Sequence, residues 1–471
     1  MKLTEITIEN YRCFERLNIS FHPEVTVLIA PNGAGKTTII DAARIAMWPL
    51  VKAFDLGSQT GKSATIQIED VRLTRRDQNN MEAVIPSIVD AQGIWPGESE
   101  EKHWIQTREK LKSGTNTLQD EHAKALTKLG KKLQNQVRDE KNLTAIDLPL
   151  IVYLGTGRLW YQGRYTSTVA DKKLDKSMQS RLWGYQNCLT TASSYKQFED
   201  WYGWVYKSYR ELQIQQLEGS DYFDFQLLEQ FKSAIQVVKQ SVNALTQKAT
   251  GWHDIEYSVS QRQQLVMNHP VHGALPLSML SDGLRNMVVM VSDIAFRCIK
   301  LNPHFGEQAA LKTEGVVMID EVDMFLHPTW QQTVIGSLRE AFPKIQFIVT
   351  THSPQVLSTV PAECIRVLRH EPDPNTGETI STAERKDEQT IGIPSSDILI
   401  DYQEVNPIPP VEEAQWVADY TALIEQGQHE SDQGKALRTK LIDIYGESHR
   451  VLLDADKLIR FQSFKQKNNK G

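Results

Sequence analysis

The sequence predicts an α/β protein whose parallel sheet carries a phosphate-binding loop, with a helical insertion and helices toward the C-terminal end. An apolar run at 25–29 leads through a glycine-rich loop into a segment with helical spacing, the order of elements that a phosphate site requires. Two further apolar runs, at 316–319 and 345–350, end in polar residues. Continuous apolar runs are typical of strands that a parallel sheet buries on both faces.

Hydrophobic spacing predicts the remaining elements. Residues 2–9 and 64–74 alternate between apolar and polar positions, which is typical of strands. The segment 150–154 is an apolar run that ends in a glycine turn and predicts another strand. Residues 118–138 place leucines along one helical stripe, and 195–247 predict two or more helices rich in aromatic residues.

Length, composition and charge limit the class of protein. At 471 residues the chain exceeds one small core, so we expect one large head with additions. The formal charge of −7 argues against coating nucleic acid by bulk attraction, although a local basic patch stays open. The 4 cysteines lie far apart without C-x-x-C spacing, and no signal segment or long apolar run is present. We therefore expect a cytoplasmic protein that is neither secreted nor embedded in a membrane.

The glycine-rich loop at 30–37 predicts a nucleotide site. Its glycines let backbone N–H groups approach phosphates at the start of a helix. Lys36 is expected to reach the β- and γ-phosphates, and the Thr37 hydroxyl to ligate Mg²⁺, a cation that prefers oxygen ligands. The first glycine of the usual pattern is Ala30, a small change at the loop entrance. The predicted nucleotide-binding residues of this loop are Asn32, Gly33, Ala34, Gly35, Lys36, Thr37 and Thr38.

The apolar run at 316–319 ends in two carboxylates with separate expected roles. In phosphoryl transfer to water, Asp320 would hold Mg²⁺ and Glu321 would orient the attacking water. Taken alone, the same pattern also fits a buried strand with acidic residues at a solvent edge. The glycine-rich loop favours the catalytic interpretation.

Residues 280–286, Leu-Ser-Asp-Gly-Leu-Arg-Asn, resemble the signature sequence of ABC-type ATPases in its RecF and SMC form. The resemblance implies an ABC-type (RecF/SMC-like) P-loop ATPase head that binds ATP between two copies. It further implies that Ser281, Asp282 and Gly283 meet the γ-phosphate held by the opposite subunit. Ser281 also fits the N-cap of the helix that follows, and both roles are compatible because a helix N-terminus attracts anions.

Three more residues fit the same family. His352, after the run at 345–350, resembles the switch histidine that senses the γ-phosphate. Asp323 lies in a segment that resembles the D-loop of RecF, OLD and SMC-like heads, which disfavours a transporter ATPase. Arg12 matches an N-terminal position that lies near the base and α-phosphate, although a plain surface strand also fits. Roughly 245 residues separate Lys36 from Ser281, which leaves room for an inserted lobe but not for a long coiled coil.

Two middle segments, 153–160 and 181–189, resemble the PtuA family, the ATPase subunits of Septu anti-phage systems. This resemblance implies an oligomer that uses ATP and Mg²⁺ to control a partner, the HNH nuclease PtuB, which cleaves DNA. A RecF-like repair ATPase that binds DNA directly is the alternative. A third hypothesis is a nuclease that acts alone, as OLD-type relatives do through a metal-dependent domain. Only about 119 residues follow His352, and Asp454 and Asp456 fit an acidic helix face better than that nuclease motif.

Two surface features bear on partners. Four lysines fall on one face of the predicted helix at 118–138 and could contact nucleic-acid phosphates. The simpler interpretation is a charged helix face that is exposed to solvent. The four are Lys124, Lys128, Lys131 and Lys132. After a proline-marked boundary at 408–410, two amphipathic helices are expected, which either pack on the head or dock a partner.

The sequence thus predicts four parts. They are an ATPase head lobe with the phosphate loop at 1–95, a mainly helical insertion at 96–250, head residues with signature, carboxylates and histidine at 251–370, and a C-terminal extension for oligomer or partner docking at 371–471.

Overall fold

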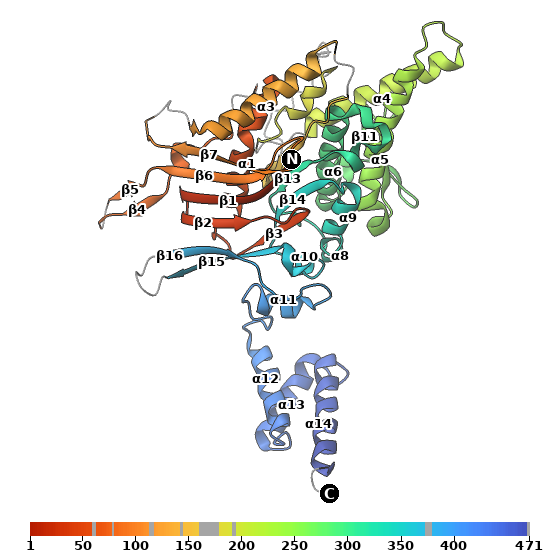
Figure 1. Ribbon diagram of the computed structural model, residues 1–471. Coiled ribbons are helices and arrows are strands. Elements are labelled where there is room, and N and C mark those ends of the chain that lie inside the picture. Colours follow the sequence, from red (N-terminus) through yellow and green to blue (C-terminus); the bar gives the residue numbers. More distant parts are fainter. Residues whose placement is uncertain are drawn as a thin grey trace. The chain divides into compact units, whose positions relative to one another are not determined.

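The computed structural model describes residues 1–58, 63–77, 80–112, 117–141, 145–159, 179–190, 195–372 and 379–468. The chain divides into two compact units, residues 1–398 and 399–471 (Figure 1). The division falls inside the short helix α11 (Ser395–Asp401). Among the described residues no helix is long and apolar enough to cross a membrane.

The first unit is built on a sheet of six strands in the order β16-β15-β3-β14-β13-β9. Neighbouring strands run parallel except at the edge, where β16 pairs antiparallel with β15. Every residue of β3, β9, β13 and β14 is buried, which explains their unbroken apolar sequence. These four predicted strands are therefore confirmed. The strands are β3 (Val25–Ile29), β9 (Leu150–Leu154), β13 (Gly315–Ile319), β14 (Ile345–Thr350), β15 (Ile365–Pro372) and β16 (Thr379–Glu384).

A second, antiparallel sheet has the order β2-β1-β6-β7-β8. Helix α1 (Lys36–Val51) packs against strands of both sheets, and 14 of its residues are buried. From Ile45 onward this helix is apolar on every side, as burial between two sheets requires. The strands are β1 (Lys2–Tyr11), β2 (Phe14–Ser20), β6 (Ser87–Ile94), β7 (Glu101–Arg108) and β8 (Leu118–Gln119).

The single strand expected at 64–74 is wrong. The segment holds a 3₁₀ turn at Ile68–Asp70 and the start of β4 (Leu73–Arg75), which pairs with β5 (Met81–Ala83). The Asp70 carboxylate accepts hydrogen bonds from the backbone N–H of Gln67 at 2.9 Å and from Arg12 Nε at 2.8 Å. These local and tertiary bonds favour a turn over the extended chain that alternation predicts.

Helices cover the sheets. Helix α3 (Glu121–Arg138) buries Leu126 and Leu133 against the head, as its spacing predicts. The two helices found in the segment 195–247 and just beyond it, α4 (Tyr195–Leu217) and α5 (Phe225–Thr250), pack against each other and against α6 (Asp282–Leu301) (Figure 1). The other elements of this unit are short. They are α2 (Asp55–Ser58), α7 (Ala309–Lys312), α8 (Pro328–Gln331), α9 (Val334–Ala341), α10 (Pro354–Leu357), β10 (His253–Ser258), β11 (Gln264–His269) and β12 (Gly273–Pro276).

The division of the chain into four parts stays a prediction, but the structure differs from it in two details. Residues 101–108 of the expected insertion form β7, and 150–154 form the edge strand β9 of the central sheet. Strand β16 lies beyond residue 370 and pairs with β15, so the head continues past the expected boundary.

The second unit has a small core of its own. Helices α12 (Glu412–Glu425), α13 (Asp432–Tyr445) and α14 (Arg450–Asn468) bury one shared cluster, of which Tyr420, Ile424 and Leu441 are nearly inaccessible. The first two helices match the expected pair, and α14 is additional. Asp456 pairs with Arg438 at 2.8 Å and Asp454 with Lys457 at 2.7 Å. These carboxylates therefore fit a helix face, as expected.

Candidate nucleotide-binding site

The glycine-rich loop joins β3 to α1 and carries the backbone that phosphate binding needs. Gly33 and Gly35 have φ of 81° and 97°, values that glycine adopts without strain. A side chain at Gly35 would lie 2.5 Å from the Phe14 ring, so the loop and the N-terminal strands are closely packed. The predicted residues Asn32, Ala34 and Thr38 lie in this loop and the first turn of α1. At the N-terminus of the 16-residue helix α1, the first backbone N–H groups have no partner within the helix and favour an anion.

Lys36 is held by the loop that contains it. Its Nζ donates to the carbonyl oxygens of Ala30 at 2.7 Å and Pro31 at 3.2 Å. Burial lowers the pKa of Lys36, while the nearby carboxylates of Asp320 and Glu321 act in the opposite direction. The ammonium group is therefore fixed at the loop by two carbonyl oxygens, and a phosphate would be a stronger partner.

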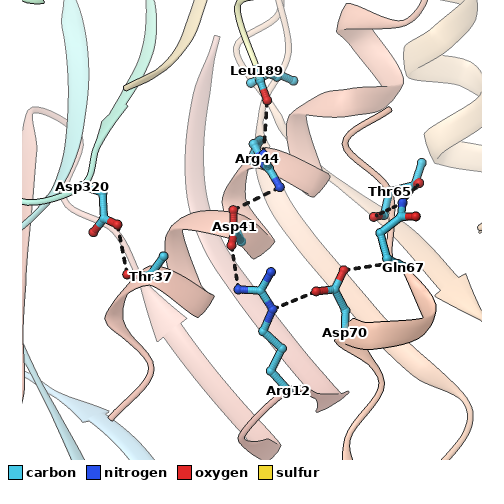
Figure 2. Close-up of polar contacts among 9 residues, drawn as sticks. All are labelled: Arg12, Thr37, Asp41, Arg44, Thr65, Gln67, Asp70, Leu189 and Asp320. Atoms are coloured by element: carbon cyan, nitrogen blue, oxygen red, sulfur yellow. Dashed lines mark hydrogen bonds and ion pairs between the residues drawn. The ribbon is translucent and has the colours of Figure 1, made fainter. Parts of the chain in front are cut away.

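The loop and the carboxylate strand meet, as predicted. Thr37 Oγ1 donates to Asp320 Oδ2 at 3.0 Å, although the two residues lie 283 positions apart (Figure 2). The other carboxylate oxygen of Asp320 accepts a hydrogen bond from Thr350 Oγ1 at 2.6 Å. A hydroxyl and a carboxylate at this separation are hard oxygen donors that suit Mg²⁺.

Glu321 follows β13 in a backbone conformation that is uncommon for glutamate, with φ of 49°. Its N–H donates to Thr350 Oγ1 at 2.7 Å, and its carbonyl accepts from Arg158 Nη2 at 2.7 Å. The chain is thus held in a turn that ends the strand at this residue. Such over-determined strain is found at functional sites more often than elsewhere.

Arg158 is a central residue that sequence reasoning did not single out. Its side chain is 3% exposed and donates to the carbonyls of Asp320 at 2.7 Å and Glu321 at 2.7 Å. It also donates to Asn286 Oδ1 on α6 at 2.7 Å and to the Gly155 carbonyl at 3.1 Å. Burial lowers its pKa to about 10 against the opposing effect of nearby carboxylates, so the group stays charged at neutral pH. One buried guanidinium therefore joins β9, the carboxylates and the signature helix.

The signature residues begin α6. Ser281 is the N-cap, and its Oγ accepts from the N–H of Leu284 at 3.4 Å, while the residue itself is exposed. Asp282, also exposed, pairs with Arg285 at 2.5 Å. Gly283 is buried, and a side chain there would lie 2.4 Å from the carbonyl oxygen of Phe325. Glycine is therefore required at 283 because another segment of backbone passes next to it.

The predicted D-loop, which contains Asp323, forms hydrogen bonds with the signature helix α6 and with the residue that follows β14. Thr351 Oγ1 donates to Asp323 Oδ1 at 2.5 Å, and Asn286 Nδ2 donates to the carbonyl of Met324 at 2.9 Å. The loop therefore links the signature helix to the end of β14. The sequence placed Asp323 in this loop, and the structure adds Asn286 as the residue that fixes it.

His352 lies just after β14 and beside the same charged cluster. Partial burial and the ammonium of Lys36 lower its pKa, while Asp323, Glu321 and Asp320 raise it to a smaller extent. A pKa below 6.5 leaves the ring mainly neutral at pH 7, so that one of its nitrogens carries a proton and the other does not. The structure thus brings the histidine, the loop lysine and the carboxylates together, as the sequence predicts.

Arg12 is engaged by carboxylates on two sides. Its Nη1 donates to Asp41 Oδ2 at 2.6 Å and its Nε to Asp70 Oδ1 at 2.8 Å (Figure 2). Asp41 in turn forms an ion pair with Arg44 at 3.1 Å on the same helix. The predicted contact of Arg12 with a nucleotide stays a prediction, since the arginine is already held by α1 and the 68–70 turn.

His370 was also missed by sequence reasoning. Its Nε2 is hydrogen-bonded to the carbonyl of Ala34 in the phosphate loop at 2.9 Å, and its Nδ1 to Ser381 Oγ on β16 at 2.8 Å. The ring stacks on Phe14 with centroids 5.8 Å apart. No motif marks this residue, because its role depends on a contact across 336 positions.

Comparisons with known proteins identify the family of the chain. The family described as "AAA domain" matches residues 5–249, more than half of the chain. A second family, described as "AAA domain, putative AbiEii toxin, Type IV TA system", matches residues 163–358.

Three curated proteins show how far the similarity extends. The probable ATPase of retron Ec83 from Escherichia coli is 24% identical over 510 aligned residues, 96% of this chain and 86% of that protein. The Septu protein PtuA of Bacillus mycoides is 41% identical over 75 residues, 16% of this chain and 10% of that protein. The OLD nuclease of Thermus scotoductus is 23% identical over 391 residues, 79% of this chain and 62% of that protein. The similarity is thus nearly full-length to the retron protein and local to PtuA.

Proposed function

Because the chain belongs to the AAA domain family and carries RecF/OLD/SMC-like motifs, we propose that it hydrolyses ATP between two copies of itself and so controls an anti-phage nuclease. The observation that carries the ATPase proposal is the meeting of Thr37 and Asp320 beside Lys36 and Glu321. Phosphate loop, metal ligands and water-directing carboxylate are the parts that phosphoryl transfer to water requires.

One copy supplies the nucleotide-binding half. Lys36 exchanges its loop carbonyls for the β- and γ-phosphates, and the Thr37 and Asp320 oxygens hold Mg²⁺. When bound, Mg²⁺ neutralises charge on the β- and γ-phosphate oxygens. Glu321 orients the attacking water, and the neutral His352 donates a hydrogen bond to the γ-phosphate. Arg12 lies near the base and the α-phosphate of the bound nucleotide.

The second copy supplies the signature half. Ser281 and Asp282 are exposed at the N-terminus of the 20-residue helix α6, where backbone N–H groups and the Ser281 hydroxyl favour an anion. Gly283 keeps that N-terminus against the D-loop, which contains Asp323. Closing α6 of one copy over the γ-phosphate of the other completes both sites of the dimer.

The biological role proposed here rests on the relatives. The relatives include the probable ATPase of retron Ec83 and the Septu protein PtuA. By analogy, the role proposed for this chain is that of a cytoplasmic defence ATPase that forms a homo-oligomer. Its partner is an HNH nuclease of the PtuB type, which cuts DNA while this chain acts as nucleotide sensor and scaffold rather than as a nuclease. Residues 399–471 fold around their own core and provide a separate module for such docking.

A RecF-like ATPase that binds DNA directly is the second candidate, favoured by the lysines of α3. Lys124, Lys128, Lys131 and Lys132 are all exposed, and the last three line one surface hollow. None of the four forms an ion pair with another described residue. Unpaired lysines one helical turn apart suit consecutive phosphates.

One experiment separates the two candidates. The tagged chain is purified from its native operon with ATP present, and whatever accompanies it is tested for DNA cleavage. An HNH protein in fixed ratio, with cleavage that responds to ATP, supports the defence complex. A chain that comes alone and binds duplex in an ATP-dependent and salt-dependent way supports the RecF-like candidate instead.

Two variants test the ATPase itself. Lys36→Ala is expected to lose tight nucleotide binding, whereas Glu321→Gln keeps binding and traps the closed dimer, seen by size-exclusion chromatography with light scattering. Normal turnover by Glu321→Gln would remove Glu321 from the water-directing role.

A further inference from the structure

The extension of strand β15 brings a histidine against the phosphate loop. Strand β15 pairs in parallel with β3, and Val367 lies opposite Ile29, the last residue of β3. There β3 leads into the loop, whereas β15 continues to Pro372. This extension carries His370 to the loop, where its Nε2 and the Ala34 carbonyl oxygen are 2.9 Å apart. The contact therefore follows from the pairing of the two strands.

The His370 ring is held in one orientation although the residue is exposed. Its Nδ1 lies 2.8 Å from Oγ of Ser381, the residue opposite it on β16. The buried Phe14 stacks on the ring, with centroids 5.8 Å and planes 25° apart. Holding an exposed side chain in one rotamer costs conformational entropy, so these contacts and the one with Ala34 must together outweigh that cost.

The hydrogen bond between His370 and Ala34 has one possible direction. A carbonyl oxygen can only accept, so Nε2 carries the proton and donates it to Ala34. The Ser381 hydroxyl can donate to Nδ1 when the ring is neutral and accept from it when the ring is charged. The contact with the loop therefore forms in both charge states of the ring.

This contact determines how the peptide group between Ala34 and Gly35 is turned. The peptide is trans, and in a trans peptide the C=O and N–H groups point in opposite directions. Holding the Ala34 carbonyl toward His370 therefore directs the Gly35 N–H to the other side. Gly35 is the N-cap of α1, so this N–H is one of those at the helix start that favour an anion.

The Ala34 carbonyl needs a partner because glycine does not fix the peptide group by itself. Gly35 has φ of 97° and no side chain, so the peptide before it can turn at low cost. The carbonyls of Ala30 and Pro31 find their partner in Lys36 of the same loop. At Ala34, in contrast, the partner comes from another strand.

We propose that His370 is a positioning residue for nucleotide binding, whose N–H holds the Ala34 carbonyl so that the Gly35 N–H meets a phosphate oxygen. This inference rests on the proposed nucleotide site and adds to it a residue from the β15–β16 edge of the sheet. His370 acts through the loop backbone rather than on the nucleotide, so its effect does not depend on the base. A loop already in its binding conformation loses less entropy when a polyphosphate binds.

The test measures the affinity of the full-length protein for MgATP and for inorganic tripolyphosphate, together with steady-state ATP hydrolysis. His370→Leu removes the donor and is expected to weaken binding of both ligands about tenfold, the effect of one lost hydrogen bond. Because this bond acts equally on bound ATP and on the transition state, KM should rise while kcat stays within about twofold. His370→Gln keeps an N–H donor and should recover most of the affinity.

His304→Leu is the matched control. His304 is also exposed, its Nε2 is also hydrogen-bonded, to Asp147 at 2.7 Å, and its ring also lies beside an aromatic ring, that of Phe305. This variant should bind both ligands as the wild type does. Ser381→Ala leaves His370 in place but removes the partner of Nδ1, and it should weaken binding of both ligands about threefold.

Three results would overturn the inference. The first is wild-type affinity in His370→Leu. The second is a loss of affinity for ATP but not for tripolyphosphate, which would place His370 at the base. The third is an equal loss of affinity in His370→Gln and His370→Leu together with an equal loss of stability in urea, which would make the role structural.

Lys36→Ala separates this inference from the proposed function. If Lys36→Ala loses tight binding while His370→Leu binds as the wild type does, only the role of His370 fails. Wild-type nucleotide binding by Lys36→Ala would instead remove the nucleotide site at this loop, and the role of His370 with it.

Discussion

Replacing Arg158 by methionine tests whether one buried guanidinium organises the catalytic strand. The arginine makes four hydrogen bonds, to the carbonyls of Gly155, Asp320 and Glu321 and to Asn286 Oδ1. Methionine fills much of the same volume but donates none of them. Three carbonyls and one amide oxygen then lose their partner in a site that water reaches poorly.

The expected loss of stability follows from these bonds. Each is worth about 1 kcal/mol net, or somewhat more from a charged donor, which gives roughly 4 kcal/mol for the set. Removing a buried charge returns part of that amount, because desolvation of Arg158 is what lowers its pKa. We therefore expect Arg158→Met to reduce the free energy of unfolding by about 3 kcal/mol. We also expect turnover to fall about 100-fold, since the Glu321 backbone is no longer fixed.

Urea denaturation at pH 7 measures the loss of stability. Steady-state ATP hydrolysis, together with a separate measurement of nucleotide affinity, measures the loss of turnover. Arg285→Met is the control on the same helix: Arg285 pairs with the exposed Asp282, and its loss should reduce stability by less than about 1 kcal/mol. Arg158→Lys keeps the charge without the planar fork and should resemble methionine in turnover. An Arg158→Met protein with the stability of the Arg285 control and the turnover of the wild type would refute the reasoning.

Three further predictions follow from single contacts. Gly283→Ala introduces a methyl group 2.4 Å from the Phe325 carbonyl, so fluorescent-nucleotide binding should persist while ATP-dependent dimerisation, measured by light scattering, is lost. Thr350→Val removes two hydrogen bonds to the carboxylate strand and should lower the unfolding free energy by about 2 kcal/mol in urea titrations. Because the pKa of His352 lies below its ordinary value of 6.5, turnover should be flat near pH 7 and fall only at lower pH as the ring gains a proton; an unchanged acid limb in His352→Gln would remove the histidine from that titration.

Local features of this fold are readable from the sequence, because they depend on neighbours in the chain. An apolar run, two glycines with positive φ and a following helix fix the phosphate loop within about a dozen positions. The meeting of Thr37 with Asp320 was predictable too, since the carboxyl ends of parallel strands, here β3 and β13 on either side of β14, lie at one edge of a sheet.

The features that sequence reasoning missed depend on distant contacts. Arg158 reaches partners 128 and 163 positions away, and His370 reaches the phosphate loop across 336 positions. The spacing of apolar residues along the chain does not indicate such distant pairs. The turn at 68–70 was missed because alternation does not show that the Asp70 carboxylate bonds both the nearby N–H of Gln67 and Arg12, 58 positions away. Alternation describes only which side chains are apolar, not which polar atoms find partners.

The contacts of Arg158 also connect two parts of one copy, the signature helix α6 and the carboxylate strand that ends at Glu321. The residue binds Asn286, and Asn286 binds the D-loop carbonyl of Met324, so hydrogen bonds join α6, the D-loop and the carboxylate strand. In the proposed dimer α6 senses the nucleotide of the other copy, whereas Glu321 acts on the nucleotide of its own. In that dimer we expect Arg158 to connect a displacement of α6 by the opposite γ-phosphate to the backbone of Glu321.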